Sequence, residues 1–212
     1  MSRPTALAQL SELAHGPGPL LVVLVGPNGA GKSTFYQRYL QATALPFINA
    51  DVLARTLIEA GAPAGEATER LAADLAGKKR REMIAQKISF VTETVFSDPV
   101  GAKVQGLRDA QAAGYAVCLI FICVESAELS ALRVETRVLA GGHDVPRDKI
   151  AGRYERMRKN VKAALAFVDF AVIVDNSSLD DPLRPVAVAA EGRVLEVYPP
   201  VPWWAEEVLP AR

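Results

Sequence analysis

A nine-residue segment, Gly-Pro-Asn-Gly-Ala-Gly-Lys-Ser-Thr at positions 26–34, constrains this chain more than any other part of it. It follows the apolar run 20–25, which has the length of a buried parallel strand, and a helix is expected after it at 32–41. The spacing is GxxxxGK[ST], and a strand before it and a helix after it are the context in which that spacing is meaningful. The segment therefore predicts a loop that binds the phosphates of a nucleoside triphosphate.

The residue types of this loop suit the binding of phosphate groups. Glycines let backbone amides approach phosphate oxygens, and the start of the next helix adds partial positive charge. We expect Lys32 to reach the β- and γ-phosphates and the Ser33 hydroxyl to ligate Mg²⁺. The predicted nucleotide-binding residues are Gly26, Pro27, Asn28, Gly29, Ala30, Gly31, Lys32, Ser33 and Thr34.

Strand-length apolar runs alternate with helical segments along the chain, which predicts an α/β fold with a mostly parallel sheet covered by helices on both faces. Further strands are expected at 46–49, 89–95, 115–124 and 171–174, and a C-terminal β-hairpin at 185–190 and 193–198. Helices are expected at 4–14, 51–60, 66–87, 99–113, 127–139 and 147–167. We expect one domain over 1–212, with a core at 20–177, a lid at 133–153, and the hairpin and tail at 183–212.

Composition narrows the function classes. The chain has 212 residues, 50% of them hydrophobic, and a formal net charge of +0, which excludes long disorder and a generally polybasic nucleic-acid or membrane binder. Neither a signal pattern nor a run long enough for a bilayer is visible, and both cysteines, Cys118 and Cys123, lie in one apolar run and are expected to be core thiols. These features predict a cytoplasmic protein.

The same phosphate-loop sequence also occurs in ABC transporter ATPases, so the chain must be compared with that class of protein. Such an ATPase needs an LSGGQ-type signature and a strand ending in Asp-Glu, and this chain has neither. Its one strand ending in aspartate, at Asp175, continues with Asn176 and Ser177. We therefore expect Asp175 to be a strand-end or turn-forming residue instead of a catalytic magnesium ligand.

A small kinase instead needs acceptor-side groups at the carboxyl ends of its strands. Asp51 follows the second strand and could take the proton of an acceptor hydroxyl; the alternative is that it caps the next helix. Glu93 ends the third strand, where a carboxylate needs a partner or a function, and could contact substrate hydroxyls or the magnesium shell. Thr94 is a further candidate substrate contact.

Basic residues gather in the predicted lid. The segment 133–162 holds nine basic and four acidic residues, a net +5 within a neutral chain. Arg133 and Arg137 are four apart and share a helix face, Gly141 and Gly142 supply a hinge, and Arg153 lies on the returning helix. This pattern is typical of a lid that brings arginines to a transferring phosphoryl group; the alternative is a solvated helical face.

Together these residues resemble the zeta toxin family of P-loop kinases, in particular its chromosomal bacterial branch. The similarity covers about 21–177 and rests on the phosphate loop, FINAD (47–51), ETVFS (93–97), GY-x-V-x-L-x-FICV (114–124), RVETRV (133–138), GGHDVPRDKI (141–150) and RYERMRKN (153–160). The resemblance implies ATP-dependent phosphorylation of UDP-N-acetylglucosamine at its 3′-hydroxyl and neutralisation by a protein antitoxin. In studied members a Glu-x-Thr pair contacts the substrate, whereas here Thr94 follows Glu93 directly.

Carried over residue by residue, the resemblance gives Lys32 and Ser33 the phosphates and Mg²⁺, Asp51 the role of base, and Glu93 a contact to the sugar-nucleotide. Arg137 and Arg153 are the expected catalytic arginines of the lid. Arg133, a candidate substrate contact, and Arg147 are the alternatives.

Two function classes remain open at this point. The first is a Mg²⁺–ATP kinase for a small molecule, with a UDP-amino sugar as the favoured acceptor and other metabolites as alternatives. The second is a nucleotide-dependent switch that hydrolyses ATP slowly and has no acceptor. The run 78–81 (Lys-Lys-Arg-Arg) is expected to be a solvated helix face, so nucleic acid is an unlikely partner, and Trp203 and Trp204 are expected to cap the core.

Overall fold

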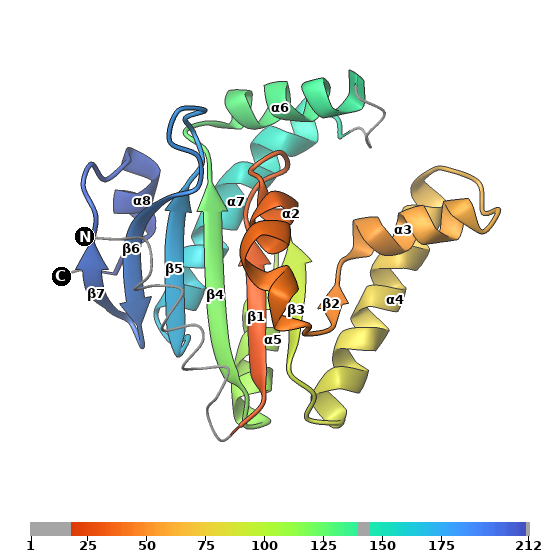
Figure 1. Ribbon diagram of the computed structural model, residues 1–212, viewed down its shortest axis with the longest axis horizontal. Coiled ribbons are helices and arrows are strands. Elements are labelled where there is room, and N and C mark those ends of the chain that lie inside the picture. Colours follow the sequence, from red (N-terminus) through yellow and green to blue (C-terminus); the bar gives the residue numbers. More distant parts are fainter. Residues whose placement is uncertain (1–17, 140–144, 211–212) are drawn as a thin grey trace.

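The computed structural model describes residues 18–139 and 145–210, which form a seven-stranded sheet flanked by helices (Figure 1). The strands are β1 (Leu20–Val25), β2 (Phe47–Ile48), β3 (Phe90–Thr94), β4 (Ala116–Cys123), β5 (Phe170–Asp175), β6 (Arg184–Ala190) and β7 (Arg193–Val197). They lie in the order β2-β3-β1-β4-β5-β6-β7. The first five pair in parallel and the last two add antiparallel, which confirms the predicted α/β sheet and its C-terminal hairpin.

Helices lie on both sides of this sheet, as predicted. They are α2 (Lys32–Phe35) with the turns η1 (Tyr36–Leu40) and η2 (Gln41–Thr43), α3 (Ala50–Glu59), α4 (Glu66–Ala85), α5 (Ala102–Ala112), α6 (Ala127–Leu139), α7 (Arg147–Leu165) and α8 (Trp203–Val208). In Figure 1, α2 lies in front of the sheet, α5 and α7 lie behind it, and α6 passes over the carboxyl ends of the central strands. Among the described helices, none is both long and apolar enough to cross a bilayer.

The core follows from the continuous apolar runs of the central strands. All six residues of β1 are at most 4% exposed, and β4 is buried from its second residue onward. Such strands suit only the middle of a sheet whose two faces are both covered. Cys118 and Cys123 are fully buried and unbridged, which confirms them as core thiols, and burial raises the pKa of Cys123 to about 12.

Some boundaries differ from the sequence prediction. The helix expected at 32–41 is a single α-helical turn followed by the π-type turn η1, in which the Tyr36 ring stacks on Phe47 at 3.8 Å. Helix α5 starts at Ala102 instead of residue 99, because Gly101 before it takes a left-handed conformation with φ 71°. The predicted helix at 4–14 and the predicted glycine hinge at 141–142 lie outside the described residues.

The tail after the hairpin folds back onto the sheet. Trp204 is fully buried, with its ring 5.4 Å from that of Phe121 and nearly perpendicular to it, which confirms that it caps the core. Trp203 is 49% exposed instead, and the Arg158 guanidinium lies 4.6 Å from its ring. Arg158 also pairs with Glu207 of α8, so helix α7 holds the tail in place.

Candidate active site

The phosphate loop lies between two neighbouring strands at the carboxyl end of β1. Val25, the last residue of β1, is in register with Thr94 of β3 on one side and Phe121 of β4 on the other. A Cβ at Gly26 would lie 2.0 Å from the Ile122 carbonyl oxygen, so no side chain fits there. Gly31 has φ 91°, a conformation that other residues rarely adopt. The fold therefore requires at least two of the glycines that the motif supplies.

Lys32 is held over this loop. Its ammonium donates to the carbonyl oxygens of Gly26 and Pro27, each at 3.0 Å, and its side chain is only 7% exposed. The Glu93 carboxylate lies 3.7 Å away and offsets the charge. A positive group fixed at this point by the loop itself suits the β- and γ-phosphates of a nucleotide, and the contact of Lys32 with those phosphates stays a prediction.

Glu93 joins three separate parts of the chain. Its Oε2 accepts hydrogen bonds from Ser33 Oγ at 3.2 Å and from Asn49 Nδ2 at 2.8 Å. The Ser33 hydroxyl and the Glu93 carboxylate are hard oxygen donors, which suit Mg²⁺. Within the described ranges no group of three or more His, Cys, Asp or Glu side chains could hold a metal. A Mg²⁺ ion here would depend on Ser33, Glu93, phosphate oxygens and water, the mixed shell that this ion prefers.

The sequence analysis missed Asn49, which is the N-cap of α3. Asn49 Oδ1 accepts hydrogen bonds from the backbone amides of Asp51 at 2.7 Å and Val52 at 3.3 Å. The Nδ2 group of the same side chain donates to Glu93 Oε2. The alternative that Asp51 caps this helix is therefore wrong. Asp51 lies in the first turn of α3 and is exposed. Its carboxylate has no hydrogen-bond or ion-pair partner among the described residues. The preference of Asn for N-caps is the signal that could have identified Asn49.

Thr94 contacts a residue that the sequence did not single out. Its Oγ1 accepts from the Phe96 amide at 3.1 Å and from Lys103 Nζ at 2.6 Å. These two bonds use both acceptor positions of the hydroxyl and leave its proton for another acceptor. Lys103 lies in the first turn of α5, and no sequence motif marks it.

The Arg133 guanidinium is bonded within the protein, and its role as a substrate contact stays a prediction. It donates to the carbonyl oxygens of Asn176 at 2.6 Å and Ser177 at 3.2 Å, in the loop after β5. Two of the five N–H donors of this guanidinium thus join α6 to the loop after β5. Asp175 is a turn former, as predicted: it accepts from Ser177 and pairs with Arg184 at 3.0 Å.

The other basic residues of the predicted lid are placed differently from one another. Arg147 pairs with Glu135, with one contact at 2.8 Å, and this bond lowers the pKa of Glu135. Arg147 therefore joins α6 to α7 and is a weaker candidate for the transferring phosphate. Arg137 is exposed in the last turn of α6, and Arg153 is half-buried on α7. The catalytic role of these two arginines stays a prediction.

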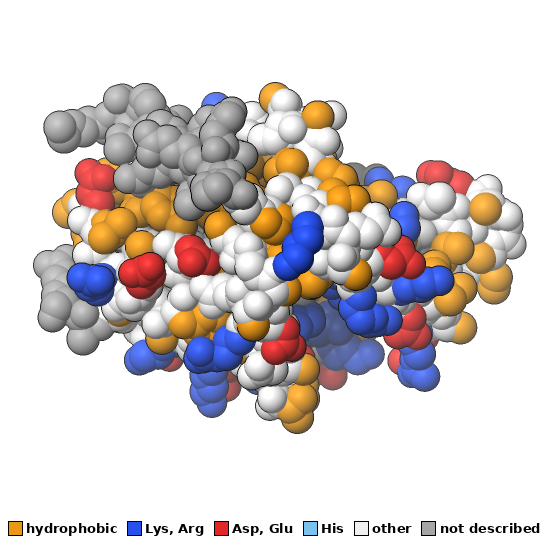
Figure 2. Space-filling model, turned by 90° about the horizontal axis from the view of Figure 1, so that it is seen from below, with side chains coloured by type: hydrophobic (Ala, Val, Ile, Leu, Met, Phe, Trp, Pro, Cys, Tyr) orange, Lys and Arg blue, Asp and Glu red, His pale blue; other side chains and the backbone are white. Residues whose placement is uncertain are grey.

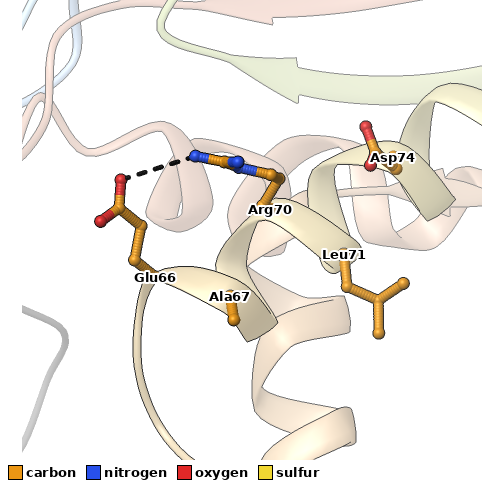
Figure 3. A pocket seen from close by; sticks show the side chains of 5 residues that line it. All are labelled: Glu66, Ala67, Arg70, Leu71 and Asp74. Atoms are coloured by element: carbon orange, nitrogen blue, oxygen red, sulfur yellow. Dashed lines mark ion pairs between the residues drawn. The ribbon is translucent and has the colours of Figure 1, made fainter.

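A surface hollow on α4 is a separate feature. Figure 3 shows its lining side chains along the first half of that helix: Glu66, Ala67, Arg70, Leu71 and Asp74. Glu66 and Arg70 form an ion pair of 3.9 Å and are both more than three-quarters exposed. None of the residues that line this hollow is a predicted site residue, and we assign no function to it.

Comparison with known proteins assigns the chain to a protein family. Residues 5–180 match the zeta toxin family. The chain belongs to the zeta toxin family. It is similar to an uncharacterized protein of Haemophilus influenzae, with 29% identity over 133 residues, 61% of this chain and 88% of that protein. The family membership and the phosphate loop together support a phosphotransferase.

Solved structures share this fold. The crystal structure of AvrRxo1-ORF1:AvrRxo1-ORF2 with sulphate ions aligns with a TM-score of 0.69 and 19% identity, over 98% of this chain and 69% of that chain. The PezAT chromosomal toxin–antitoxin system of Streptococcus pneumoniae aligns with a TM-score of 0.61 and 19% identity, over 87% of this chain and 79% of that chain.

Proposed function

We propose that this protein is an ATP-dependent kinase that transfers the γ-phosphoryl group to a hydroxyl of a small acceptor, with a UDP-amino sugar such as UDP-N-acetylglucosamine as the first candidate. The observation that carries the proposal is the convergence of Lys32, Ser33, Asn49 and Glu93 at the carboxyl ends of β1 and β3. Membership of the zeta toxin family supports it. So does the fold shared with AvrRxo1-ORF1, which was solved with ATP (TM-score 0.61, 19% identity).

The residues on the loop side would bind and polarise the nucleotide. The amides of the loop and the Lys32 ammonium would neutralise the phosphate oxygens, where charge changes during transfer. Ser33 and Glu93 would hold Mg²⁺ between them and the phosphates. When bound, the ion supplies charge neutralisation to the β- and γ-phosphate oxygens.

The residues beyond the second and third strands would handle the acceptor. Asp51 would accept the proton of the attacking hydroxyl as its oxygen bonds to the γ-phosphorus and the bond from that phosphorus to the ADP oxygen breaks. Glu93 and Thr94 would orient the acceptor through hydrogen bonds. Arg137 and Arg153 would approach the transferring group from α6 and α7.

A protein partner is part of the proposal. The PezAT structure is described as a toxin–antitoxin system, and AvrRxo1-ORF1 was solved in complex with ORF2. By analogy we propose that a protein antitoxin binds this chain. We also expect the protein in the cytoplasm, where ATP and nucleotide sugars are available.

The test is transfer from γ-labelled ATP to UDP-N-acetylglucosamine and to a panel of other hydroxyl-bearing metabolites, with products identified by mass. Asp51→Asn should lower kcat by about 10²–10⁴-fold while ATP binding is kept, because only the proton acceptor is lost. Asp109→Asn, an exposed carboxylate on α5 whose one side-chain bond is to Gln105, is the matched control.

Two outcomes would contradict the proposal. One is ATP hydrolysis without any labelled acceptor, which would favour a nucleotide-dependent switch. The other is an equal loss of ATP binding and of transfer in Asp51→Asn, which would make this aspartate a structural residue.

A further inference from the structure

The proposed chemistry uses only Arg153 of the segment RYERMRKN (153–160) in helix α7. Three other residues of this segment bond to main-chain carbonyl oxygens just beyond the ends of two strands. Tyr154 Oη donates to the first carbonyl oxygen after β4 at 2.7 Å, and Arg156 and Asn160 donate to the segment after β3. Helix α7 is therefore joined to the path of the main chain at the edge of the sheet where the candidate site lies.

The segment after β3 turns sharply at Phe96. This residue has φ 64°, a left-handed conformation that costs free energy in any residue except glycine. Its ring is 1% exposed and belongs to the main core, so glycine could not replace it without a loss of packing. Such a conformation persists only where the surrounding contacts hold it. The contacts of Phe96 therefore determine the path of the chain directly after Glu93 and Thr94, the residues proposed to orient the acceptor substrate.

Asn160 supplies two of these contacts with one amide group. Its Nδ2 donates to the carbonyl oxygens of Phe96 at 2.9 Å and Asp98 at 3.0 Å. Arg156 Nε donates to the Ser97 carbonyl oxygen between them at 3.1 Å. Residues 156 and 160 are four apart, so three successive carbonyl groups are bonded to one face of α7. Asn160 is half-buried and Arg156 is exposed, so the bonds of Asn160 are the better shielded from water.

The same turn fixes the Thr94 hydroxyl. The Phe96 amide donates to Thr94 Oγ1 at 3.1 Å, which requires the chain to fold back within two residues. Asn160 thus acts on Thr94 through a single residue. Its side chain holds the carbonyl group of Phe96, and the N–H group of Phe96 holds the hydroxyl oxygen. Removal of the Asn160 amide would therefore loosen one of the two groups that fix this hydroxyl.

Strand β3 and helix α7 carry groups that would act on the same reaction. Glu93 and Thr94 of β3 would orient the acceptor substrate, and Arg153 of α7 would approach the transferring phosphoryl group. Arg153 and Asn160 are seven residues apart and share one face of α7. A displacement of about 1 Å between reacting groups can lower a rate about 10²-fold. The bonds of Asn160 hold these two elements at a fixed separation, which is what such a reaction needs.

We infer that Asn160 is a positioning residue for phosphoryl transfer, which holds the segment 94–98 in the conformation that orients the acceptor substrate. The inference rests on the proposed kinase function, and Asn160 itself acts only through the main chain of this segment. A side-chain amide suits the role, because two carbonyl oxygens need two N–H donors and the carboxylate of aspartate has none. Asn160 therefore serves the acceptor step and not the binding of ATP.

Steady-state kinetics separate this role from a merely structural one. Asn160→Ala and Asn160→Asp each remove both donors. With UDP-N-acetylglucosamine as the varied substrate, we expect kcat/KM to fall about 10–10²-fold in both variants, because the acceptor is held out of line. With ATP as the varied substrate, KM should stay within about twofold of the wild type, because the phosphate loop keeps its own bonds.

Gln111→Ala is the matched control. Gln111 Nε2 also makes two bonds across the fold, to the Phe167 carbonyl oxygen at 3.0 Å and to Asp169 Oδ2 at 2.8 Å. These bonds lie where β4 and β5 begin, at the end of the molecule seen in Figure 2 and opposite the phosphate loop. We expect Gln111→Ala to lower the midpoint of thermal unfolding about as much as Asn160→Ala does, and to leave the kinetic parameters unchanged.

Three kinetic results would overturn the inference. The first is unchanged kcat/KM for the acceptor in both Asn160 variants. The second is an equal change in the constants for ATP and for the acceptor, which would indicate a general loss of structure. The third is the same kinetic change in Gln111→Ala.

Hydrogen exchange tests the positioning without catalysis. We expect the Phe96 amide, observed by NMR, to exchange about five- to tenfold faster in Asn160→Ala and at the wild-type rate in Gln111→Ala. Unchanged exchange in Asn160→Ala would overturn the inference even if the kinase is active. If the wild type transfers phosphate to no acceptor, the kinase proposal fails instead, and faster exchange in Asn160→Ala alone would still show that Asn160 holds the segment.

Discussion

The two sides of the phosphate loop differ in how completely their polar side chains are bonded within the protein. On the β4–β5 side, protein groups bind one another. Asn176 bonds to the Ala30 carbonyl oxygen at 2.9 Å and to the Leu183 amide at 3.0 Å, and Ser130 of α6 bonds to the Asn28 carbonyl oxygen at 2.5 Å. On the β3–β2 side, Glu93 and Thr94 are also bonded within the protein. The side chains of Asp51, Arg80 and Arg153, however, have no hydrogen-bond or ion-pair partner among the described residues.

This difference separates a preformed half of the site from a half that is completed by its ligand. The bonded side fixes the shape of the loop before any nucleotide arrives, because its carbonyl groups are held by side chains from α6 and from the loop after β5. The other side keeps its charges available, at a cost in stability that a bound acceptor would offset. Variants on the two sides should therefore affect different measurements.

Lys32 stands at the boundary between the two sides, so its replacement should have the largest effect. Lys32→Met removes the bonds to Gly26 and Pro27 and the charge opposite Glu93, and we expect kcat for phosphoryl transfer to fall by about 10²–10³-fold or more. Steady-state kinetics with the acceptor found above measure it. Lys162→Met, an exposed lysine at the end of α7, should change kcat little. A comparable loss in both variants would show that overall charge, not position, matters.

Asn176 tests the preformed side. Asn176→Ala leaves the Ala30 carbonyl and the Leu183 amide without their partner, and we expect the free energy of unfolding to fall by about 1–3 kcal/mol. Urea unfolding measures the change. Leu179→Ala in the same loop, at a residue 88% exposed, should stay within about 0.5 kcal/mol of the wild type. If Asn176→Ala is as stable as Leu179→Ala, this side of the loop is not held by its hydrogen bonds.

Sequence reasoning succeeded where one local pattern determines the structure. The glycine spacing after an apolar run fixed the loop, and runs such as 115–124 are too apolar for anything but a central strand. It was less successful where the hydrogen-bond partner of a side chain is distant in sequence. Arg133 has the same helical spacing whether it faces phosphate or the Asn176 carbonyl, and only the packing of α6 on the β5 loop decides between these.

The acceptor side shows the same limit in another form. Asn49, Arg80 and Lys103 are separated from one another by 23 to 54 residues in sequence, and no short motif connects them. A basic run such as 78–81 looks uniform in sequence, yet Arg80 is half-buried and the other three residues are exposed, because only one face of a helix points inward. The groups that bring ATP are therefore readable from the sequence, and those that would choose the acceptor are not.

Lys103 gives the smallest and most specific test of the open side, through pH. Desolvation lowers the pKa of Lys103 in the folded protein, and Arg80 and Arg153 add to this, so the folded state binds the Lys103 proton less tightly than the unfolded state does. Below the folded pKa the charge therefore destabilises the fold, and this penalty is relieved as the pH rises toward the unfolded value of about 10.4. Lys103→Met should consequently be at least as stable as the wild type at pH 7, with the difference shrinking as the pH is raised. Urea unfolding at several pH values measures it, with Lys79→Met as the reference. If the wild type gains no stability relative to Lys103→Met as the pH is raised, the charge on Lys103 does not destabilise the folded state. The contrast between the two sides would then lose its electrostatic basis.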